Sequence, residues 1–170
     1  TSNRINTPEV GEKVLATGCA DMVSLARPML ADADFVKKAI NGTGNQIAPC
    51  IACNQACLDH TFGGKLTSCL VNPLACHETE LLVEQSHIAK NVAIVGAGPA
   101  GLSTALTAAQ RGHTVTLFDK ADEIGGQLNM AKQVPGKEEF WGLVDWYCTM
   151  IAEAGVTVKL GTEVNAVDLA

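Results

Sequence analysis

Four cysteines lie close together in the segment PCIACNQACLDHTFGGKLTSCLVNP, residues 49–73. They follow the spacing C-x2-C-x3-C-x11-C and are Cys50, Cys53, Cys57 and Cys69. Thiolate is a soft ligand, and a set of four is typical of zinc or of an iron-sulfur cluster. Zinc ribbons present two separate C-x2-4-C pairs, whereas here three thiols fall within eight residues and the fourth stands alone. The spacing therefore favours an iron-sulfur cluster and leaves structural zinc as the alternative.

Three further cysteines, Cys19, Cys76 and Cys148, stand outside this pattern. The total of seven is odd and the chain opens TSNRINTPEV, without a secretory signal, so we expect reduced thiols and a cytoplasmic setting. Cys19 and Cys148 are interpreted as ordinary packed thiols. Cys76 is near enough to replace Cys69 as the fourth ligand, but we predict Cys69, because the turn SCLVNP presents it beside the other three.

A second motif, VGAGPAGL, begins at residue 95 and contains Gly96, Gly98 and Gly101 in the pattern G-x-G-x-x-G. An expected strand precedes it and an expected helix, residues 99–111, follows, which is the context that a dinucleotide-binding turn requires. Gly96 allows the tight turn, Gly98 lets the backbone approach a pyrophosphate, and Gly101 lets the helix pack close to the strand. The free amides at the helix N-terminus then favour the phosphates.

An acidic residue, Asp119, ends the next expected strand, 18 residues after Gly101. A carboxylate there can bond both hydroxyls of an unphosphorylated adenosine ribose, as in FAD or NAD. The motif does not separate these two ligands. A second glycine loop, residues 125–126, followed by Gln127, favours FAD, because a bare backbone suits a long ligand.

Helices and strands at the expected places would position both motifs. A helix at 8–17, a buried strand in ADMVSLARP and a helix in DADFVKKAI follow the rhythm of an α/β barrel. The cysteine segment shows no sustained helical or strand periodicity, so a structural metal centre or another cross-link is needed to hold it in one conformation. After it we expect strand, helix, strand, helix, strand, with NVAIVG as a buried strand and a helical stripe of Phe140, Val144, Tyr147 and Ile151. We therefore predict an α/β chain in four parts: residues 1–45, the C-terminal end of a (β/α)8 barrel; 46–80, the iron-sulfur segment; 81–90, a linker; and 91–170, the first half of a Rossmann-like FAD-binding domain.

Composition excludes some classes of function. The net charge is −6 and no lysine or arginine cluster occurs, which argues against nucleic acid as a partner. No apolar run approaches the ~20 residues needed to cross a bilayer, so no membrane partner is expected. The chain begins with Thr and stops soon after the nucleotide-binding pattern begins, so we expect a fragment of a longer protein whose remainder is its partner. Oligomeric state is left open.

The motifs together resemble the NADH:flavin oxidoreductase and trimethylamine dehydrogenase family, and within it the bacterial 2,4-dienoyl-CoA reductases. The resemblance extends over essentially the whole chain. It is carried, in order, by SNRINTP, ARPMLADADF, PCIACNQACLD, SCLVNPLACHE, VGAGPAGL and IGGQLNMAKQVPGKEEF.

The resemblance implies a set of cofactors and their contacts. The four cysteines of the C-x2-C-x3-C-x11-C pattern would hold a [4Fe-4S] cluster. Arg4, Ala26 and Arg27 would contact FMN, although on its own pattern Arg27 would be read as a solvated or salt-bridged arginine. The implied FAD contacts are Gly96, Gly98, Ala100, Gly101, Asp119, Gln127 and Lys137. NADPH would bind outside this segment.

The implied activity is that of an NADPH-dependent oxidoreductase that reduces an enoyl or dienoyl thioester, most simply 2,4-dienoyl-CoA in fatty acid oxidation. The alternatives are an amine dehydrogenase, an enoate reductase or an NADH oxidase of the same family. Amine dehydrogenases of the family tend to space their cysteines C-x2-C-x2-C-x12-C, which favours the reductases here. A non-enzymatic alternative is an electron-transfer or scaffold module in which zinc holds two domains together. No catalytic residue is assigned, and the segment alone is expected to be inactive. The histidines, interpreted as solvated, are His60, His77, His87 and His113.

Overall fold

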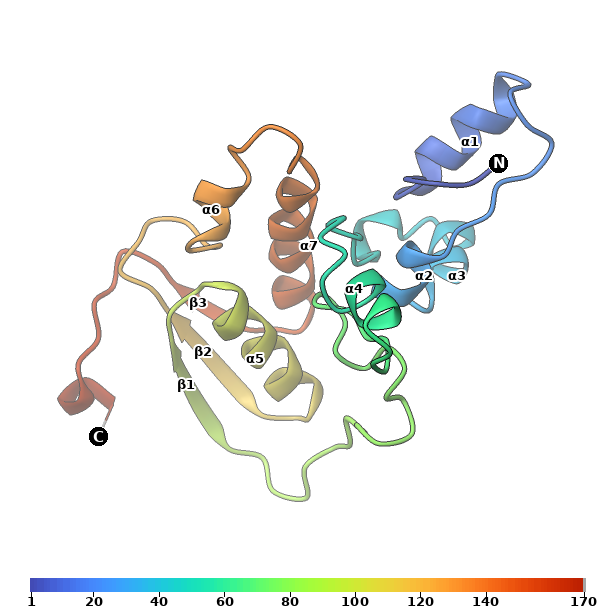
Figure 1. Cartoon of the computed structure of the whole chain (residues 1–170). Helices are drawn as coiled ribbons and strands as arrows, with labels where there is room; N and C mark the ends of the chain where they lie inside the picture. The colour runs from blue at the N-terminus through green and yellow to red at the C-terminus, as the bar shows by residue number, and fades with distance from the viewer. Residues whose placement is uncertain (170) are drawn as a thin grey trace. The chain divides into compact units, whose positions relative to one another are not determined.

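The computed structural model describes residues 1–169 and divides into two compact units, Thr1–Leu82 and Val83–Ala170 (Figure 1). Each unit has buried apolar side chains of its own. No helix formed by residues 1–169 is long and apolar enough to cross a membrane.

The second unit contains a parallel sheet with the strand order β1-β2-β3 (Figure 1). The strands are β1 (Asn91–Val95), β2 (Thr114–Phe118) and β3 (Thr157–Lys159). The helices are α5 (Pro99–Gln110), α6 (Leu128–Ala131) and α7 (Glu139–Glu153), with a 3-10 turn η2 (Ala166–Leu169) near the end. The α/β fold with a parallel sheet, predicted from the alternation of patterns, is thereby confirmed.

Apolar residues of β2 and α5 form the centre of this unit. Val115 and Leu117 of β2 and Leu102 of α5 are its largest fully buried side chains. The helix α7 buries Val144, Tyr147 and Ile151, as its spacing predicts, with Leu143 more deeply buried than the predicted Phe140. The prediction of an amphipathic helix was therefore correct, but the observed buried face is rotated slightly about the helix axis from the predicted one.

The first strand, β1, is not the buried strand that its sequence predicts. Exposed and half-buried residues alternate along it, and Val95 is 57% exposed. A parallel strand is buried on both faces only when further strands and helices cover it. Within residues 1–169, β1 pairs with β2 alone, so its apolar residues lie at an edge of the sheet.

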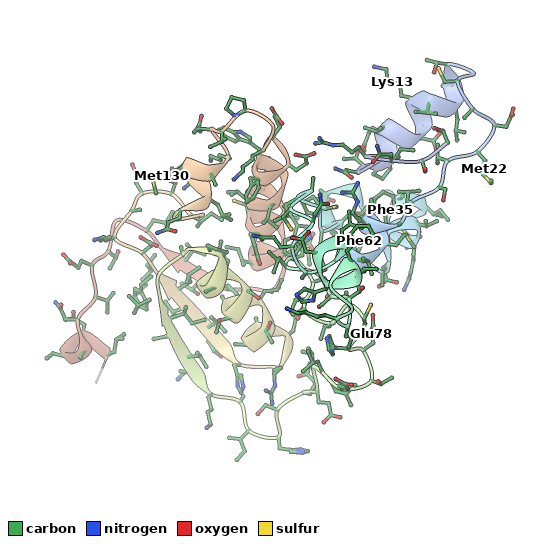
Figure 2. All side chains as sticks on the ribbon, in the orientation of Figure 1. Lys13, Met22, Phe35, Phe62, Glu78 and Met130 are labelled. Atoms are coloured by element: carbon green, nitrogen blue, oxygen red, sulfur yellow. The ribbon has the colours of Figure 1, made fainter. Side chains whose placement is uncertain are left out.

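The regular elements of the first unit are short helices joined by long irregular segments. Its elements are α1 (Pro8–Ala16), α2 (Arg27–Ala31), α3 (Phe35–Ile40), the 3-10 turn η1 (Gly44–Gln46) and α4 (Leu58–Phe62). Thr7 caps the start of α1, where its hydroxyl accepts a hydrogen bond from the Val10 amide. Phe35 on α3, labelled in Figure 2, is one of the most buried large side chains of this unit.

Two local predictions for the first unit were wrong, and one short helix was missed. The strand expected in ADMVSLARP is reduced to one parallel bridge between Ser2 and Ser24. A parallel strand forms only when neighbouring strands accept and donate its hydrogen bonds. Within residues 1–169, the only neighbour of this segment is the short stretch at Ser2. Arg27, which lies within the strand expected in ADMVSLARP, instead begins the helix α2. The helix α4 lies in the cysteine segment, where the sequence shows no sustained period.

A buried carboxylate, Asp32, connects α3 to the segment that leads to the cysteines. Its Oδ2 accepts hydrogen bonds from Lys38 Nζ at 2.5 Å and from the Ala48 amide at 2.9 Å. Lys38 Nζ also donates to the Gln46 carbonyl at 3.0 Å. The Asp32 side chain is 6% exposed. This network fixes the chain two residues before Cys50.

Replacing Asp32 with Ala in the full-length protein should loosen residues 46–48. Removing one partner of a buried ion pair costs about 3 kcal/mol or more, so hydrogen exchange at the Ala48 amide should become roughly a hundredfold faster. The control is Asp34→Ala, because Asp34 is 61% exposed and its Lys37 partner is 3.8 Å away, which predicts a change below about 0.5 kcal/mol. Equal exchange rates in the two variants would contradict the assignment.

Candidate cofactor sites

The four cysteines of the predicted set line one cavity in the first unit. Cys50 is buried and the other three are half-buried. Ala52 (φ 53°) and Asn54 (φ 62°), in the left-handed region, are unusual there because neither is glycine. These two left-handed residues change the direction of the backbone between the first three cysteines. The thiols that share the cavity are those of Cys50, Cys53, Cys57 and Cys69.

The fourth cysteine, Cys69, reaches this cavity because hydrogen bonds close a loop of the chain. The Ser68 amide donates to the Ala56 carbonyl at 2.7 Å. Asn72 Nδ2 donates to the Leu30 carbonyl at 2.9 Å. These two bonds hold both sides of Cys69 against the rest of the unit.

The remaining cysteines are exposed and do not line the cavity. Cys76 lies in a turn with φ 64°. Cys19 and Cys148, predicted to be packed, are instead exposed. The geometry agrees with Cys69 as the fourth ligand, which stays a prediction.

The chemistry of the donor set fits an iron-sulfur cluster. Burial raises the pKa of the Cys69 thiol. Burial also raises the pKa of the Cys50 thiol, against the opposing effects of a hydrogen bond with the Ala52 backbone and of the Arg27 charge. These thiols are therefore protonated at neutral pH until a metal displaces their protons. Among residues 1–169, no three His, Cys, Asp or Glu side chains are arranged to hold one metal ion. Four cysteine sulfurs are the soft donor set that an iron-sulfur cluster takes.

A second cavity, of about 380 Å³, lies between the segments 2–6 and 24–28. It is within the size range of small-molecule sites. Arg4, Ala26 and Arg27, the residues predicted to contact FMN, all line it. Guanidinium groups pair well with phosphate, so the lining fits a flavin phosphate. Arg27 also lines the cysteine cavity.

The glycine turn of the second unit connects β1 to α5, as the motif predicts. Gly96 has φ 107°, which favours glycine. A Cβ on Gly101 would lie 1.8 Å from the Gly96 carbonyl oxygen, so close packing of helix on turn requires glycine there. A Cβ on Gly98, by contrast, would meet no atom within 4 Å. The protein's own packing does not require Gly98, and the open space beside it suits an approaching phosphate.

Asp119 braces this turn through its carboxylate. Oδ1 accepts a hydrogen bond from the Ala121 amide at 2.8 Å and Oδ2 one from the Ala97 amide at 2.6 Å. These two hydrogen bonds lower the pKa of Asp119, so the side chain is charged at neutral pH. A carboxylate offers about four acceptor positions, so acceptors remain for ribose hydroxyls.

The glycines of the second loop, residues 125–126, are explained by a backbone contact that the sequence did not show. The Gly125 amide donates to the Ala97 carbonyl at 2.8 Å. A Cβ on Gly126 would lie 3.0 Å from the Gly98 Cα. The two loops therefore pack backbone against backbone. This contact accounts for the bare backbone of residues 125–126 without a ligand, which weakens the sequence argument for FAD.

The predicted FAD contacts are not all brought together. Gly96 and Asp119 line a cavity of about 280 Å³ at the carboxyl ends of the strands. Sequence reasoning missed its other side, Thr162, Glu163 and Val164. Their position just after the third strand was the available signal, because the carboxyl ends of parallel strands share one edge. The other predicted contacts, which do not line this cavity, are Gly98, Ala100, Gly101, Gln127 and Lys137.

The parallel sheet and its glycine turn define the second unit as Rossmann-like, and residues 94–153 match the family model described as NAD(P)-binding Rossmann-like domain. The whole chain is similar to part of larger redox enzymes. It is 42% identical over 161 residues to the metal reductase of Desulforamulus reducens, covering 95% of this chain and 24% of the relative. It is 40% identical over 168 residues to the NADH oxidase of Thermoanaerobacter brockii, covering 98% and 26%.

Among solved structures, the chain is similar to 2-naphthoyl-CoA reductase in complex with 2-naphthoyl-CoA. The TM-score is 0.95 at 35% identity, covering 99% of this chain and 26% of that one. This chain thus spans about a quarter of the length of its relatives. All three carry the names of oxidoreductases, which supports the predicted class of activity at that level.

Proposed function

We propose that this chain is the middle part of an iron-sulfur flavoprotein oxidoreductase. In this proposal residues 1–45 end a flavin-binding barrel, residues 46–80 hold a [4Fe-4S] cluster, residues 81–90 are a linker, and residues 91–170 begin an FAD-binding domain. The observation that carries it is the single cavity shared by Cys50, Cys53, Cys57 and Cys69. The adjoining cavity with Arg4, Ala26 and Arg27 supports FMN beside it.

The proposed cofactors divide the chemistry. When bound, FAD, the cluster and FMN would together supply the electron transfer from NADPH to the substrate. This chain's residues supply placement and charge: thiolates for iron, guanidinium groups for a flavin phosphate, and the Asp119 carboxylate with the glycine turn for the adenosine end of FAD. The NADPH site and the proton donors lie in parts of the protein outside these residues.

We propose that the substrate is a conjugated acyl thioester of the 2,4-dienoyl-CoA class. Overall, one NADPH and one proton are consumed and one carbon-carbon double bond is lost. Two observations support a thioester over an amine. The cysteine spacing C-x2-C-x3-C-x11-C differs from the C-x2-C-x2-C-x12-C that the family resemblance implies for amine dehydrogenases. The similar structure of 2-naphthoyl-CoA reductase is a complex with a conjugated acyl-CoA.

The test uses the full-length protein, purified without oxygen. We expect equal iron and sulfide, both FMN and FAD, and NADPH oxidation that depends on added 2,4-dienoyl-CoA. Colourless protein with stoichiometric zinc would contradict the cluster. If dimethylamine reduced the cluster of the full-length protein and NADPH did not, the result would contradict the substrate class and favour an amine dehydrogenase. The 170-residue segment alone should show no turnover.

A further inference from the structure

Arg27 is the residue that the two cavities of the first unit have in common. It is the first residue of α2 and lines both the cysteine cavity and the cavity proposed for FMN. Its guanidinium has two separate hydrogen bonds. Nη1 donates to Asn54 Oδ1 at 2.7 Å, and Nη2 donates to Asn3 Oδ1 at 3.3 Å. One arginine is thus held from both sides.

The two acceptors come from the two different sites. Asn54 lies between Cys53 and Cys57 in the cysteine loop, whereas Asn3 lies on the wall of the other cavity. Both have left-handed backbone conformations, φ 62° and φ 84°. Asparagine tolerates this conformation better than most residues. Both positions therefore combine an unusual backbone with a side chain turned toward Arg27.

Both acceptors are neutral amides. A carboxylate in either place would cancel most of the positive charge of Arg27, but an amide fixes the guanidinium and leaves the charge in place. The shorter bond, to Asn54, is part-buried, whereas the bond to Asn3 is exposed. Water therefore competes less for the Asn54 bond, and Asn54 is the stronger of the two in fixing Arg27.

We propose that Asn54 is a positioning residue that holds Arg27 between the two cavities, so that one positive charge serves both cofactors. This inference rests on the proposed function, because it assumes a cluster and FMN. Electron transfer to the cluster adds one negative charge, which a nearby guanidinium stabilises. The same guanidinium pairs with the flavin phosphate. Loss of Asn54 should therefore weaken FMN binding and also make the cluster harder to reduce.

The experiment compares four variants of the full-length holoprotein with the wild type. Two measurements are made on each: the dissociation constant of FMN after flavin removal, and the cluster midpoint potential by EPR-monitored redox titration. Arg27→Gln removes the charge and Arg27→Lys retains it. Asn54→Gly removes the amide without straining the left-handed backbone. Ala52→Gly is its matched control, because it places glycine at the other left-handed position in the same loop.

For Arg27→Gln we expect at least about tenfold weaker FMN binding. We also expect a roughly tenfold shift of the cluster's one-electron equilibrium toward the oxidised state, which corresponds to a potential about 59 mV more negative. Arg27→Lys should restore most of the potential. Asn54→Gly should weaken FMN binding about three- to tenfold and lower the potential in the same direction, while Ala52→Gly changes neither.

A further variant separates the two cavities. Arg4 lines the proposed FMN cavity but not the cysteine cavity. Arg4→Gln should therefore weaken FMN binding with little effect on the cluster potential. The same potential shift in Arg4→Gln and Arg27→Gln would overturn the shared-charge inference.

The remaining outcomes are also decisive. If Asn54→Gly matches Ala52→Gly in both measurements, Asn54 does not position Arg27 and the inference is wrong, although the proposed function stands. If Asn54→Gly loses its iron, its FMN dissociation constant decides the question, and FMN binding as tight as in Ala52→Gly overturns the inference. Wild-type protein without cluster or FMN would instead contradict the proposed function itself.

Discussion

Replacing Cys69 with Ser in the full-length protein is expected to abolish the iron and sulfide content. Four cysteine sulfurs line the cysteine cavity, and a hydroxyl is a much poorer ligand for iron than a thiolate. Even the loss of an outer-shell partner costs about 10–100-fold in metal affinity, so the loss of a direct ligand should cost more. Iron and acid-labile sulfide assays and the loss of the brown colour measure the effect. FAD content should be unchanged, because the glycine turn belongs to the other unit.

The control for this prediction is Cys76→Ser in the same segment. Cys76 is exposed and does not line the cavity, so its replacement should leave iron and sulfide at wild-type levels. The two variants have the same change of chemistry and differ only in position. Loss of iron in Cys76→Ser with retention in Cys69→Ser would mean that Cys76 is the fourth ligand.

The Rossmann-like unit could be predicted from the sequence because its signals are local. The helix α5 follows a glycine turn, and Gly112, with φ 86°, ends it where the pattern predicts. Exposure was harder to predict. The sequence NVAIV is apolar enough for a central strand, yet β1 lies at an edge within residues 1–169. Burial depends on neighbours that the local pattern does not contain.

For the candidate site of the first unit, the cysteine ligands could be predicted from the sequence, but the hydrogen bonds of Arg27 to Asn54 and Asn3 could not. Cysteine spacing is a local signal, and the four thiols do share a cavity. The bond from Arg27 to Asn54 joins residues 27 apart, and the bond to Asn3 joins residues 24 apart. No periodicity connects them, and the left-handed conformations of both asparagines depend on tertiary packing. Short helices such as α4 were missed for the same reason, since five residues carry little helical pattern.

Replacing Gly101 with Ala should destabilise the second unit and, at the same time, weaken binding of the proposed FAD. The new Cβ would lie 1.8 Å from the Gly96 carbonyl oxygen and 3.5 Å from Ile94 Cγ2. Because a backbone atom cannot move aside as a side chain can, α5 must shift away from β1. Overpacking of this kind costs about 1–3 kcal/mol or more. In the full-length protein we expect a lower thermal midpoint for this unit and FAD affinity reduced by roughly one to two decades.

Gly98→Ala is the comparison that separates packing from ligand binding. Its Cβ would meet no protein atom within 4 Å, and the backbone φ of −77° is ordinary for alanine. The flavin-free protein should therefore unfold at the wild-type temperature, whereas FAD affinity should fall, because the methyl group fills the space in which a pyrophosphate approaches the helix N-terminus. Calorimetry of the flavin-free protein and titration with FAD give the two quantities separately. If Gly98→Ala bound FAD as tightly as the wild type, the turn would not be the phosphate site, and the open space beside Gly98 would need another explanation.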